Sequence, residues 1–282
     1  MHPLAAVVIT YHPSDDFYNH LETYITQVDR LFVVDNSEPK FQFNGELLAN
    51  PKIILINNGA NEGIAARLNQ VAHQAVKEGY QWLLTMDQDS FFETEHLSAY
   101  FEYVMDYPGA DQVAMFGVET NQAPEIIADL TEPVDRLITS GSLVNLQLFA
   151  EVGDFDEKLF IDEVDHEYCY RASLKGYKII QFTHIYLHHR LGEDVIVRTL
   201  KGRRKQTAFH SPLRLYYMLR NYLYLTAKYK PAFEKDLKFR GKGLLHRIKN
   251  NLLYGPDKLV LLKMLYSAYR DYKTGRMGKK VA

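Results

Sequence analysis

The stretch Trp82-Leu83-Leu84-Thr85-Met86-Asp87-Gln88-Asp89-Ser90 joins an apolar run to two carboxylates. Its apolar part predicts a buried β-strand over Trp82–Met86, and the polar residues that follow predict the strand's end. Three similar runs precede it along the chain, at Leu4–Thr10, Leu31–Val34 and Lys52–Ile56. Because helical patterns alternate with these runs, the sequence predicts an α/β fold with a mainly parallel sheet.

A helix is predicted between the third and fourth strands by the spacing of its apolar residues. These fall on one face of a 3.6-residue period and are Ile64, Leu68, Val71, Ala72, Ala75 and Val76. Gly79 is expected to end this helix. Further strands are predicted at Val113–Val118 and Ile138–Val144, a helix at Val164–Lys175, and mainly helices from Ser211 onward, after a loop or boundary at Arg198–Lys205.

Charge divides the chain into two regions. Residues 1–197 carry 11 Lys+Arg and 31 Asp+Glu, whereas residues 198–282 carry 22 and 4, and the whole chain has a formal net charge of −2. We therefore predict two functional regions, of which residues 1–197 form the acidic α/β domain. The basic helical region over residues 198–282 is expected to face an anionic partner.

The composition excludes several classes of protein. Of the 282 residues, 46% are hydrophobic and 24% charged, which suffices for a large core and excludes disordered or low-complexity chains. Cys169 is the one cysteine, so a disulfide framework and a cysteine-based zinc site are excluded, and a reducing compartment is expected. No apolar window is long enough for a transmembrane helix, and the N-terminal residues lack the pattern of a signal peptide.

Polar residues gather at the predicted carboxyl ends of the strands. Tyr11 follows the first strand, Asp35 the second, and Asp87 and Asp89 the fourth. Ligands of open α/β sheets bind at this edge. Two carboxylates one residue apart can hold a divalent cation together with a diphosphate, a combination that suits Mg²⁺ or Mn²⁺. The same pattern is common in surface turns, so it is the position after a buried strand that favours a metal site.

The segment Asn58-Gly59-Ala60-Asn61-Glu62-Gly63 precedes the predicted helix, and two interpretations fit it. Asn61 could cap the helix within a glycine-rich turn. The main chain could also line a pocket for a nucleotide or phosphate at the helix N-terminus. The lysine and glycine spacings of a P-loop or a dinucleotide fingerprint are absent. The two interpretations are compatible.

Four carboxylates lie within residues 162–167. A helix that begins near Val164 places Asp165 at its N-terminus, where negative charge is favoured. This is typical of an ordinary acidic first turn or, given the apolar neighbours, of a half-buried acid/base site. Further on, His188 and His189 are adjacent, and one of them could complete a metal shell begun by the aspartates.

Taken in order, these segments resemble the inverting family 2 glycosyltransferases of GT-A fold, and most closely the bacterial rhamnosyltransferases of cell-wall and O-antigen polysaccharide synthesis. The resemblance spans residues 4–225. It is carried by Val8-Ile9-Thr10-Tyr11, Val33-Val34-Asp35-Asn36-Ser37, Asn61-x-Gly63-Ile64-Ala65-x-x-Leu68-Asn69, Leu84-Thr85-Met86-Asp87-Gln88-Asp89-Ser90, Ile138-Thr139-Ser140-Gly141-Ser142, Leu159-Phe160-Ile161-Asp162-x-Val164-Asp165-x-Glu167, His189-x-Leu191-Gly192 and Ser211-Pro212-x-Arg214-x-Tyr216-Tyr217-x-x-Arg220-Asn221.

The resemblance implies a binding site for the donor nucleotide. Thr10, Tyr11 and Asp35 would hold the nucleoside, with Asp35 at the edge of the pyrimidine. Asn61 and Gly63 would line the nucleotide pocket.

The resemblance also implies a metal site and a base. Asp87 and Asp89 would bind the sugar and, with His189, a Mn²⁺ or Mg²⁺ ion on the diphosphate. Asp165 would be the catalytic base, although Val164 stands where many relatives have glutamate. Further substrate contacts are implied for Ser140, Gly141, Glu167 and Arg220.

The implied activity is inverting transfer of a sugar to a hydroxyl of a lipid-linked saccharide, with dTDP-L-rhamnose as donor and a UDP-hexose or UDP-galactofuranose as the alternative. The basic region would bind an anionic membrane surface from the cytoplasmic side, or form a dimer contact. A metal-dependent nucleotidyltransferase could use the same aspartates. A nucleic-acid-binding protein is disfavoured because the acidic half would repel a phosphate backbone.

Overall fold

The computed structural model describes residues 3–120, 130–189, 194–198, 202 and 204–281, and the chain divides into two units. Unit 1 comprises Met1–Phe160 and Val164–Arg190, and unit 2 comprises Ile161–Glu163 and Leu191–Ala282. The two units are separated between residues 190 and 191. The functional boundary that the charge pattern places after residue 197 stays a prediction. The short segment Ile161–Glu163 belongs to unit 2 although its neighbours in the sequence belong to unit 1.

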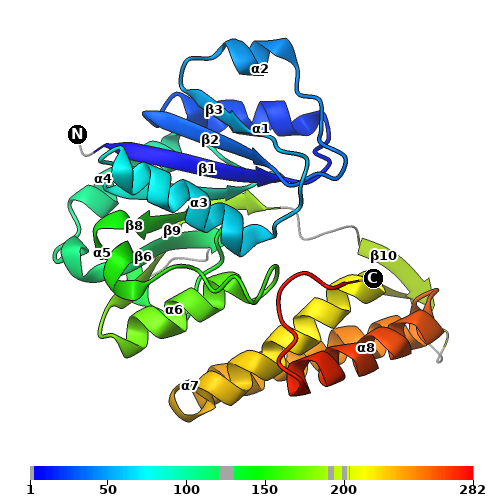
Figure 1. Cartoon of the computed structure of the whole chain (residues 1–282). Coiled ribbons are helices and arrows are strands. Elements are labelled where there is room, and N and C mark those ends of the chain that lie inside the picture. The colour runs from blue at the N-terminus through cyan, green and yellow to red at the C-terminus, as the bar shows by residue number, and fades with distance from the viewer. Residues whose placement is uncertain (1–2, 121–129, 190–193, 199–201, 203, 282) are drawn as a thin grey trace. The chain divides into compact units, whose positions relative to one another are not determined.

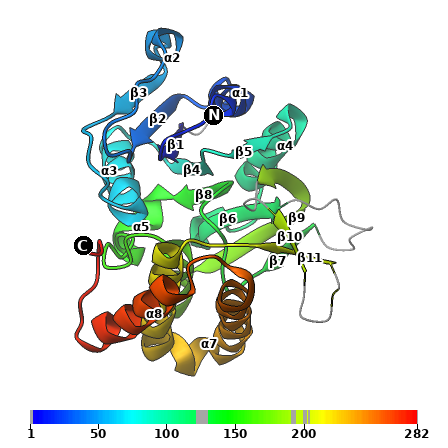
Figure 2. The same cartoon turned by 90° about the vertical axis from the view of Figure 1, so that its right-hand side faces the viewer.

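Unit 1 is built on a mixed sheet with the strand order β3-β2-β1-β4-β8-β6-β9-β5, and β7 pairs with β9 (Figures 1 and 2). Its strands are β1 (Leu4–Thr10), β2 (Arg30–Asp35), β3 (Ile53–Ile56), β4 (Trp82–Asp87), β5 (Ser90–Phe92), β6 (Val113–Thr120), β7 (Thr131–Pro133), β8 (Ser142–Asn145) and β9 (Lys178–His189). The four strands from β3 to β4 are parallel, as predicted, and β8 pairs antiparallel with both of its neighbours. The predicted α/β class is confirmed.

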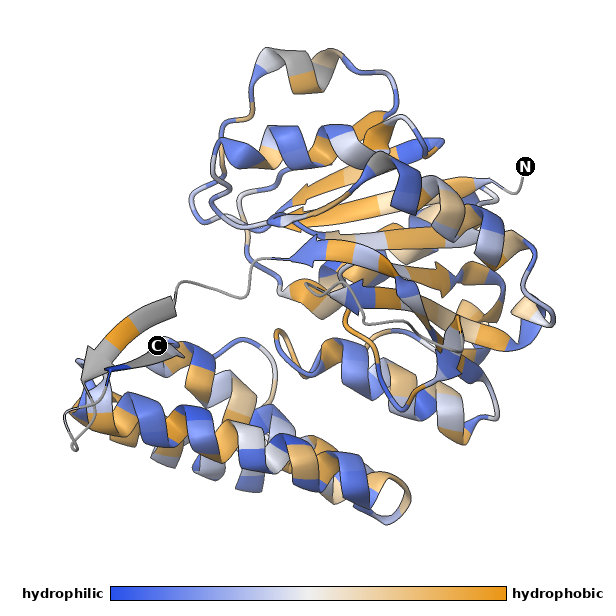
Figure 3. Ribbon diagram, turned by 180° about the vertical axis from the view of Figure 1, so that it is seen from behind, coloured by the Kyte–Doolittle hydropathy of each residue, from blue (hydrophilic) through white to orange (hydrophobic). Residues whose placement is uncertain are grey.

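Helices cover both faces of this sheet. They are α1 (Asp16–Ile25), α2 (Gly45–Ala49), α3 (Ile64–Lys77), α4 (Thr94–Met105), α5 (Leu146–Val152) and α6 (Val164–Leu174). Successive strand residues point to opposite faces, so one core forms under α1 and α4 and another under α3, α5 and α6. The hydrophobic strands between amphipathic helices are visible in Figure 3.

Two local predictions for unit 1 need correction. Residues 138–141 form a turn rather than the first half of a strand, because Ser142 donates to the carbonyls of Ile138 and Thr139 and Gly141 has a φ of +76°. The helix α3 does end before Gly79, whose φ is +85°, but Val76 at its end is exposed rather than part of the buried face.

Unit 2 is a helical pair with a hairpin (Figure 2). The strands β10 (Asp194–Arg198) and β11 (Arg204–Ala208) are antiparallel, so Arg198, Arg204 and Lys205 of the predicted loop lie in paired strands instead. Ser211 caps the long helix α7 (Pro212–Tyr254), which is kinked near Pro231 and Phe233 and packs against α8 (Lys258–Lys273). Within the described residues, no helix combines the length and apolarity needed to cross a bilayer.

Candidate active site

Three predicted site residues meet at the carboxyl edge of the parallel strands. Thr10 of β1 lies opposite Asp35 of β2, and Ile9 lies opposite Asp87 of β4. The strand register therefore brings the predicted nucleoside residues and the first metal-site aspartate to one edge of the sheet, which is where open α/β sheets bind ligands.

Asp35 is fully buried and organises the loop that follows β2. Its Oδ1 accepts the hydroxyl of Thr10 at 3.4 Å and the N–H of Ser37 at 3.0 Å, and its Oδ2 accepts the N–H of Phe41 at 2.8 Å. The carboxylate thereby fixes the loop after β2, where the sequence predicts the nucleoside to bind. Direct reading of a pyrimidine by Asp35 stays a prediction.

Gln88, between the two aspartates, holds the end of β1. Its side-chain carbonyl accepts the N–H of Tyr11 at 2.7 Å, and its amide donates to the carbonyl of Tyr11 at 3.3 Å. The side chain thus continues the ladder between β1 and β4 by one residue. Tyr11 itself is exposed, with its ring edge-on to His12, so it can offer a flat surface to a base.

The loop before α3 is held by Arg67, a fully buried cation. Its guanidinium donates to Asn36 Oδ1 at 2.9 Å, to Asn58 Oδ1 at 2.6 Å and to the carbonyl of Ala60 at 2.8 Å. It also pairs with Glu62 at 3.0 Å. One buried side chain therefore shapes most of the predicted nucleotide loop.

Gly63, rather than Asn61, is the N-cap of α3. Asn61 makes a tighter local turn, in which its Oδ1 accepts the N–H of Gly63 at 3.1 Å. Gly63 has a φ of +85°, and a Cβ there would lie 2.6 Å from the carbonyl oxygen of Phe160. Glycine is required at this position because both the conformation and the close approach exclude a side chain. The capping interpretation of Asn61 is wrong, whereas its role in nucleotide binding stays a prediction.

Asp87, Asp89 and His189 form a cluster that could hold a metal ion, because each offers a ligand atom and these atoms lie within 4.8 Å of one another. His189 Nδ1 lies 3.9 Å from Asp87 Oδ2 and 3.7 Å from Asp89 Oδ1. Two carboxylates and one imidazole suit a divalent cation such as Mn²⁺, and the partial exposure of all three leaves room for diphosphate oxygens.

The neighbouring residues select His189 over His188. The hydroxyl of Ser90, which is buried, lies 2.7 Å from His189 Nδ1, the same nitrogen that faces the two aspartates. His188 instead lies 3.3 Å from Glu93 Oε1 and stacks on Phe91. Successive residues of a strand point to opposite faces, so only one of the two histidines can reach the aspartates.

The turn at residues 139–141 joins this cluster to Asp165. The hydroxyl of Ser140 accepts the N–H of Asp87 at 3.2 Å, and Gly141 donates its N–H to the carbonyl of Thr85 at 2.8 Å. The N–H of Thr139 donates to Asp165 Oδ2 at 3.3 Å. The turn at residues 139–141 therefore contacts both the carboxylate of Asp165, the candidate base, and the end of β4, which carries Asp87.

Asp165 is the second residue of α6, as the sequence predicts, and its side chain is largely buried. Its Oδ1 accepts the N–H of His166 at 2.8 Å, so main-chain groups orient both carboxylate oxygens. His166 Nδ1 lies 3.8 Å from Asp165 Oδ1, whereas each competing carboxylate pairs with an arginine. Asp162 pairs with Arg214, Glu163 with Arg240, and the fully buried Glu167 with Arg171. Substrate binding by Glu167 stays a prediction.

Arg220 lies in unit 2, fully buried against Tyr216 and Tyr217. Its guanidinium donates to the carbonyl of Gly278 at 2.8 Å and to the hydroxyl of Tyr216 at 3.3 Å. The predicted substrate contact of Arg220 stays a prediction. Cys169 is buried and burial raises the pKa of its thiol, which agrees with a packing residue.

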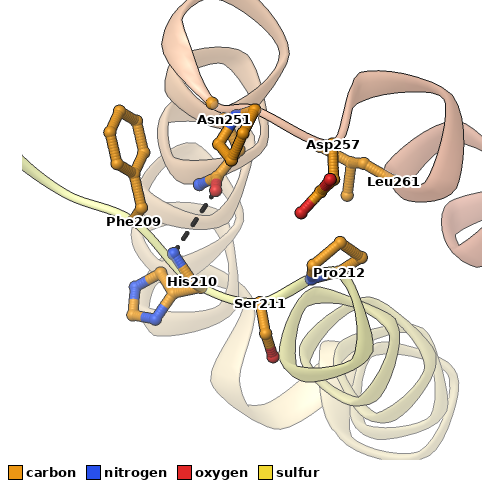
Figure 4. A pocket seen from close by; sticks show the side chains of 9 residues that line it. Phe209, His210, Ser211, Pro212, Asn251, Asp257 and Leu261 are labelled. Carbon is orange, nitrogen blue, oxygen red and sulfur yellow. Dashed lines mark hydrogen bonds between the residues drawn. The ribbon is translucent and has the colours of Figure 1, made fainter.

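A small pocket of about 220 Å³ lies where α7 and α8 begin (Figure 4). Ser211 Oγ accepts the N–H of Arg214 there, and Asn251 Oδ1 accepts the N–H of His210 at 3.3 Å. No residue that the sequence singled out as a site lines this pocket. One of these contacts caps the start of α7, and the other joins the last turn of α7 to the segment before its start.

Three residues of the site were not singled out from the sequence. Arg67 lies three residues after Ile64 and four before Val71, so its position on the apolar face of α3 marks it as a buried cation. Gln88 and Ser90 lie within the motif of the two aspartates. Their contacts are with Tyr11 and His189, and no local pattern reveals partners so distant in sequence.

The fold and this strand-end site agree with a glycosyltransferase, and the chain belongs to glycosyl transferase family 2, whose model matches residues 6–149. It is 30% identical over 240 residues to the dTDP-rhamnosyl transferase RfbF of Shigella flexneri, a match that covers 79% of each chain. The predicted family is confirmed, and membership favours glycosyl transfer over nucleotidyl transfer and nucleic-acid binding.

Solved structures confirm the fold. The crystal structure of S. aureus TarS matches with a TM-score of 0.55 and 13% identity, over 96% of this chain and 49% of that chain. The crystal structure of GalNAc-T7 with UDP, GalNAc and Mn²⁺ matches with a TM-score of 0.57 and 11% identity, over 97% and 56%. This chain therefore spans about half the length of these two neighbours.

Proposed function

We propose that this protein transfers L-rhamnose from dTDP-L-rhamnose, with inversion, to a hydroxyl of a lipid-linked saccharide. The observation that carries the proposal is the shared turn at residues 139–141, which supports Asp165 and the Asp87 strand end in a chain 30% identical to a dTDP-rhamnosyl transferase. The name of that relative supports the rhamnosyl donor, and the class of enzyme follows from the family.

In the proposed reaction, the carboxylate of Asp165 accepts the proton of the acceptor hydroxyl. The acceptor oxygen forms a bond to the anomeric carbon while the bond to the diphosphate oxygen breaks, and the electron pair leaves with the nucleoside diphosphate. One displacement inverts the anomeric centre. A Mn²⁺ or Mg²⁺ ion held by Asp87, Asp89 and His189 would neutralise charge on the leaving diphosphate.

The donor is tested by thermal unfolding with a panel of nucleotide sugars in Mn²⁺ or EDTA. We expect dTDP-L-rhamnose with Mn²⁺ to raise the melting temperature most, because a donor at a hundredfold excess over Kd stabilises by about 2.7 kcal/mol. UDP-glucose and UDP-galactofuranose serve as comparisons. Stabilisation and transfer with a UDP-sugar alone would overturn the rhamnosyl donor while leaving the family's chemistry in place.

Unit 2 is proposed to bind the cytoplasmic face of an anionic membrane, where a lipid-linked acceptor would lie. The helix α8 exposes Leu259, Leu262, Tyr266 and Tyr269 at a spacing that places them on one face. Lysines and arginines flank them at positions 258, 263, 270 and 273. An apolar face with basic neighbours is typical of a helix that lies in a membrane interface, where each basic residue contributes about 1 kcal/mol.

This surface is tested by flotation with vesicles of neutral or anionic lipid. Binding should require anionic lipid, weaken with salt, and fall at least tenfold in Leu259→Ser/Leu262→Ser. Leu174→Ser, which changes an exposed leucine of α6, is the matched control. Equal binding to neutral vesicles, or a protein concentration-dependent dimer that the double substitution abolishes, would contradict the membrane role.

A further inference from the structure

The three residues of the metal-ion cluster come from two segments of unit 1 that meet in a short ladder. Asp87 ends β4 and Asp89 precedes β5, whereas His189 is the last residue of β9. The segments are joined because β5 pairs with β9, over three residues and at the end of the described sheet. Three residues is at the lower end of strand lengths, so contacts outside the ladder matter for the distance between the ligands.

Gln88, between the two aspartates, is held from two sides. Its side chain is hydrogen-bonded to the main chain of Tyr11 at the end of β1. Its main-chain carbonyl oxygen lies 3.2 Å from Nδ1 of His20, a residue of α1. A carbonyl oxygen only accepts hydrogen bonds, so Nδ1 of His20 carries the hydrogen and donates this bond. The bond fixes the peptide group that joins Gln88 to Asp89.

The ring of His20 also begins a stack of three aromatic rings. His20 lies on Phe91 with the ring centroids 5.1 Å apart, and Phe91 lies on His188 with the centroids 4.6 Å apart. The interplanar angles are 11° and 12°, so the three rings are nearly parallel. Phe91 and His188 are direct partners in the ladder between β5 and β9. The stack therefore connects α1 to both strands of this ladder.

The stack lies behind the metal-ion cluster. Ser90 and His189 form the neighbouring pair of the ladder, and successive residues of a strand point to opposite faces. Phe91 and His188 therefore lie on the face opposite to Ser90 and His189. Contacts on that face can hold the ligands in place without filling the space that an ion and a diphosphate need.

The helix that carries His20 is anchored in the core of unit 1. Phe17, Leu21 and Tyr24 of α1 are buried there, and their spacing of three or four residues places them on one face of the helix. His20 lies three residues after Phe17 and four before Tyr24, so it lies at the edge of this buried face. The helix also packs against β5. It therefore gives the turn after β4 a rigid support.

We propose that His20 is a positioning residue of the metal site. It acts through Gln88 and Phe91 and does not contact the ion. Its hydrogen bond and its ring stack keep Asp89 and His189 at the separation that one divalent cation requires. This inference rests on the metal site of the proposed function and is independent of which sugar is transferred.

The proposal is tested by titration of the full chain with Mn²⁺ alone, in which electron paramagnetic resonance measures the free ion. Asp89→Ala defines the binding outside the cluster, which is subtracted. His20→Ala removes both the hydrogen bond and the stack, so the Kd for Mn²⁺ should rise about tenfold, as for residues that support metal ligands. His73→Ala is the matched control and should leave the Kd unchanged. His73 is a histidine of α3 that pairs with Asp154 and contacts Phe149, neither of which belongs to the cluster.

Two further variants separate the two contacts of His20. His20→Asn keeps a donor for the carbonyl of Gln88 but removes the ring, because its amide nitrogen stands as many bonds from the main chain as Nδ1 does. His20→Phe keeps the ring and removes the donor. Each should bind Mn²⁺ more tightly than His20→Ala and more weakly than the wild type. General destabilisation of α1 would instead lower the melting temperature and leave the Kd unchanged.

A wild-type Kd in His20→Ala overturns the proposal, as does a Kd that is raised equally in all three substitutions of His20. If His20→Ala fails to fold, as judged by its melting temperature, Phe91→Leu replaces it, since this change removes both stacking contacts and should also raise the Kd. The titration contains no nucleotide and no sugar. Failure of this inference would therefore leave the proposed transfer untouched, and failure of the donor test would leave the role of His20 untouched.

Discussion

The hydroxyl of Ser140 accepts a hydrogen bond from the main-chain N–H of Asp87, over 3.2 Å. The neighbouring Thr139 donates its own N–H to Asp165. Ser140 thus belongs to a turn that contacts both the metal-site strand and the candidate base. The turn exists because Gly141 adopts a positive φ that lets the chain reverse under Leu187.

Replacing Ser140 with alanine should weaken metal-dependent donor binding. The N–H of Asp87 loses its acceptor, and an unsatisfied buried donor costs about 1–3 kcal/mol of the free energy of unfolding. Urea unfolding and titration with donor and Mn²⁺ measure the two effects. Ser142→Ala is the control, since Ser142 donates to Ile138 in the same turn and does not contact Asp87 in the described hydrogen bonds. Unchanged donor affinity in Ser140→Ala would show that the turn does not support the metal site.

Asp89→Ala should abolish the Mn²⁺ dependence of donor binding. The cluster would be left with one carboxylate and one imidazole, too few ligands to hold a hard cation on a diphosphate. Isothermal titration with and without Mn²⁺ measures the change. Glu93→Gln is the control, because Glu93 is exposed and pairs with His188 outside the cluster. Metal-dependent affinity equal to that of the wild type would mean that the site has been misassigned.

Arg67→Met should destabilise unit 1 and weaken donor binding together. Asn36, Asn58 and Ala60 each lose a donor, so the free energy of unfolding should fall by more than about 2 kcal/mol. Limited proteolysis of the loop at residues 58–63 and donor titration report on the loop itself. Lys77→Met, which removes a cation from the exposed end of the same helix, should change neither.

The regular elements of unit 1 were predictable because their signals are local. The strand Leu4–Thr10 and the helix from Ile64 to Lys77 are defined by patterns within each segment, and the structure reproduces them. The turn at Ile138–Gly141 was mistaken for a strand, since its apolar residues resemble one. Its conformation depends on Gly141 and on hydrogen bonds to Thr85 and Ser142, which a local pattern does not encode.

Asp87, Asp89 and His189 could be predicted to lie together because their motifs follow one another along the chain in the order typical of the family. The residues that hold these side chains and loops in place could not be predicted in this way. They are Arg67, Gln88 and Ser90, and their hydrogen-bond partners lie up to 99 residues away in the sequence. Asn61 failed as a cap for a related reason. The helix begins at Ile64 with Gly63 as its N-cap, and Phe160, far along the chain, accepts the N–H of Ile64 at 2.6 Å.

Unit 2 should lose stability as the pH falls below about 6.5. Burial and the charges of Arg247 and Arg214 hold the pKa of His210 below its ordinary value of 6.5. Between these two pKa values the unfolded state binds more protons than the folded state, so stability declines as the pH falls through this window and is unaffected well above it. Urea unfolding at pH 7.5 and 5.5 should show a smaller decline in His210→Gln than in the wild type. An identical decline would contradict the assignment to His210.

Asp165→Asn should abolish most transfer and spare donor binding. Asparagine keeps the size of the side chain and can accept the N–H of Thr139 or of His166, but it cannot take a proton from the acceptor. The loss of a positioned base lowers the rate by about 10²–10⁴. The metal cluster lies on β4, the residues after it and β9, so the Kd of the donor should change little. Single-turnover rates at saturating donor measure the first effect and calorimetric titration the second.

The decisive comparison is with Glu167→Gln. Glu167 is fully buried and both of its oxygens accept N–H groups of Arg171, so this substitution should lower the melting temperature. Its effect on the turnover of folded enzyme should be small, because the side chain faces the interior of unit 1 rather than an acceptor. Near-normal turnover in Asp165→Asn would transfer the role of base to another carboxylate.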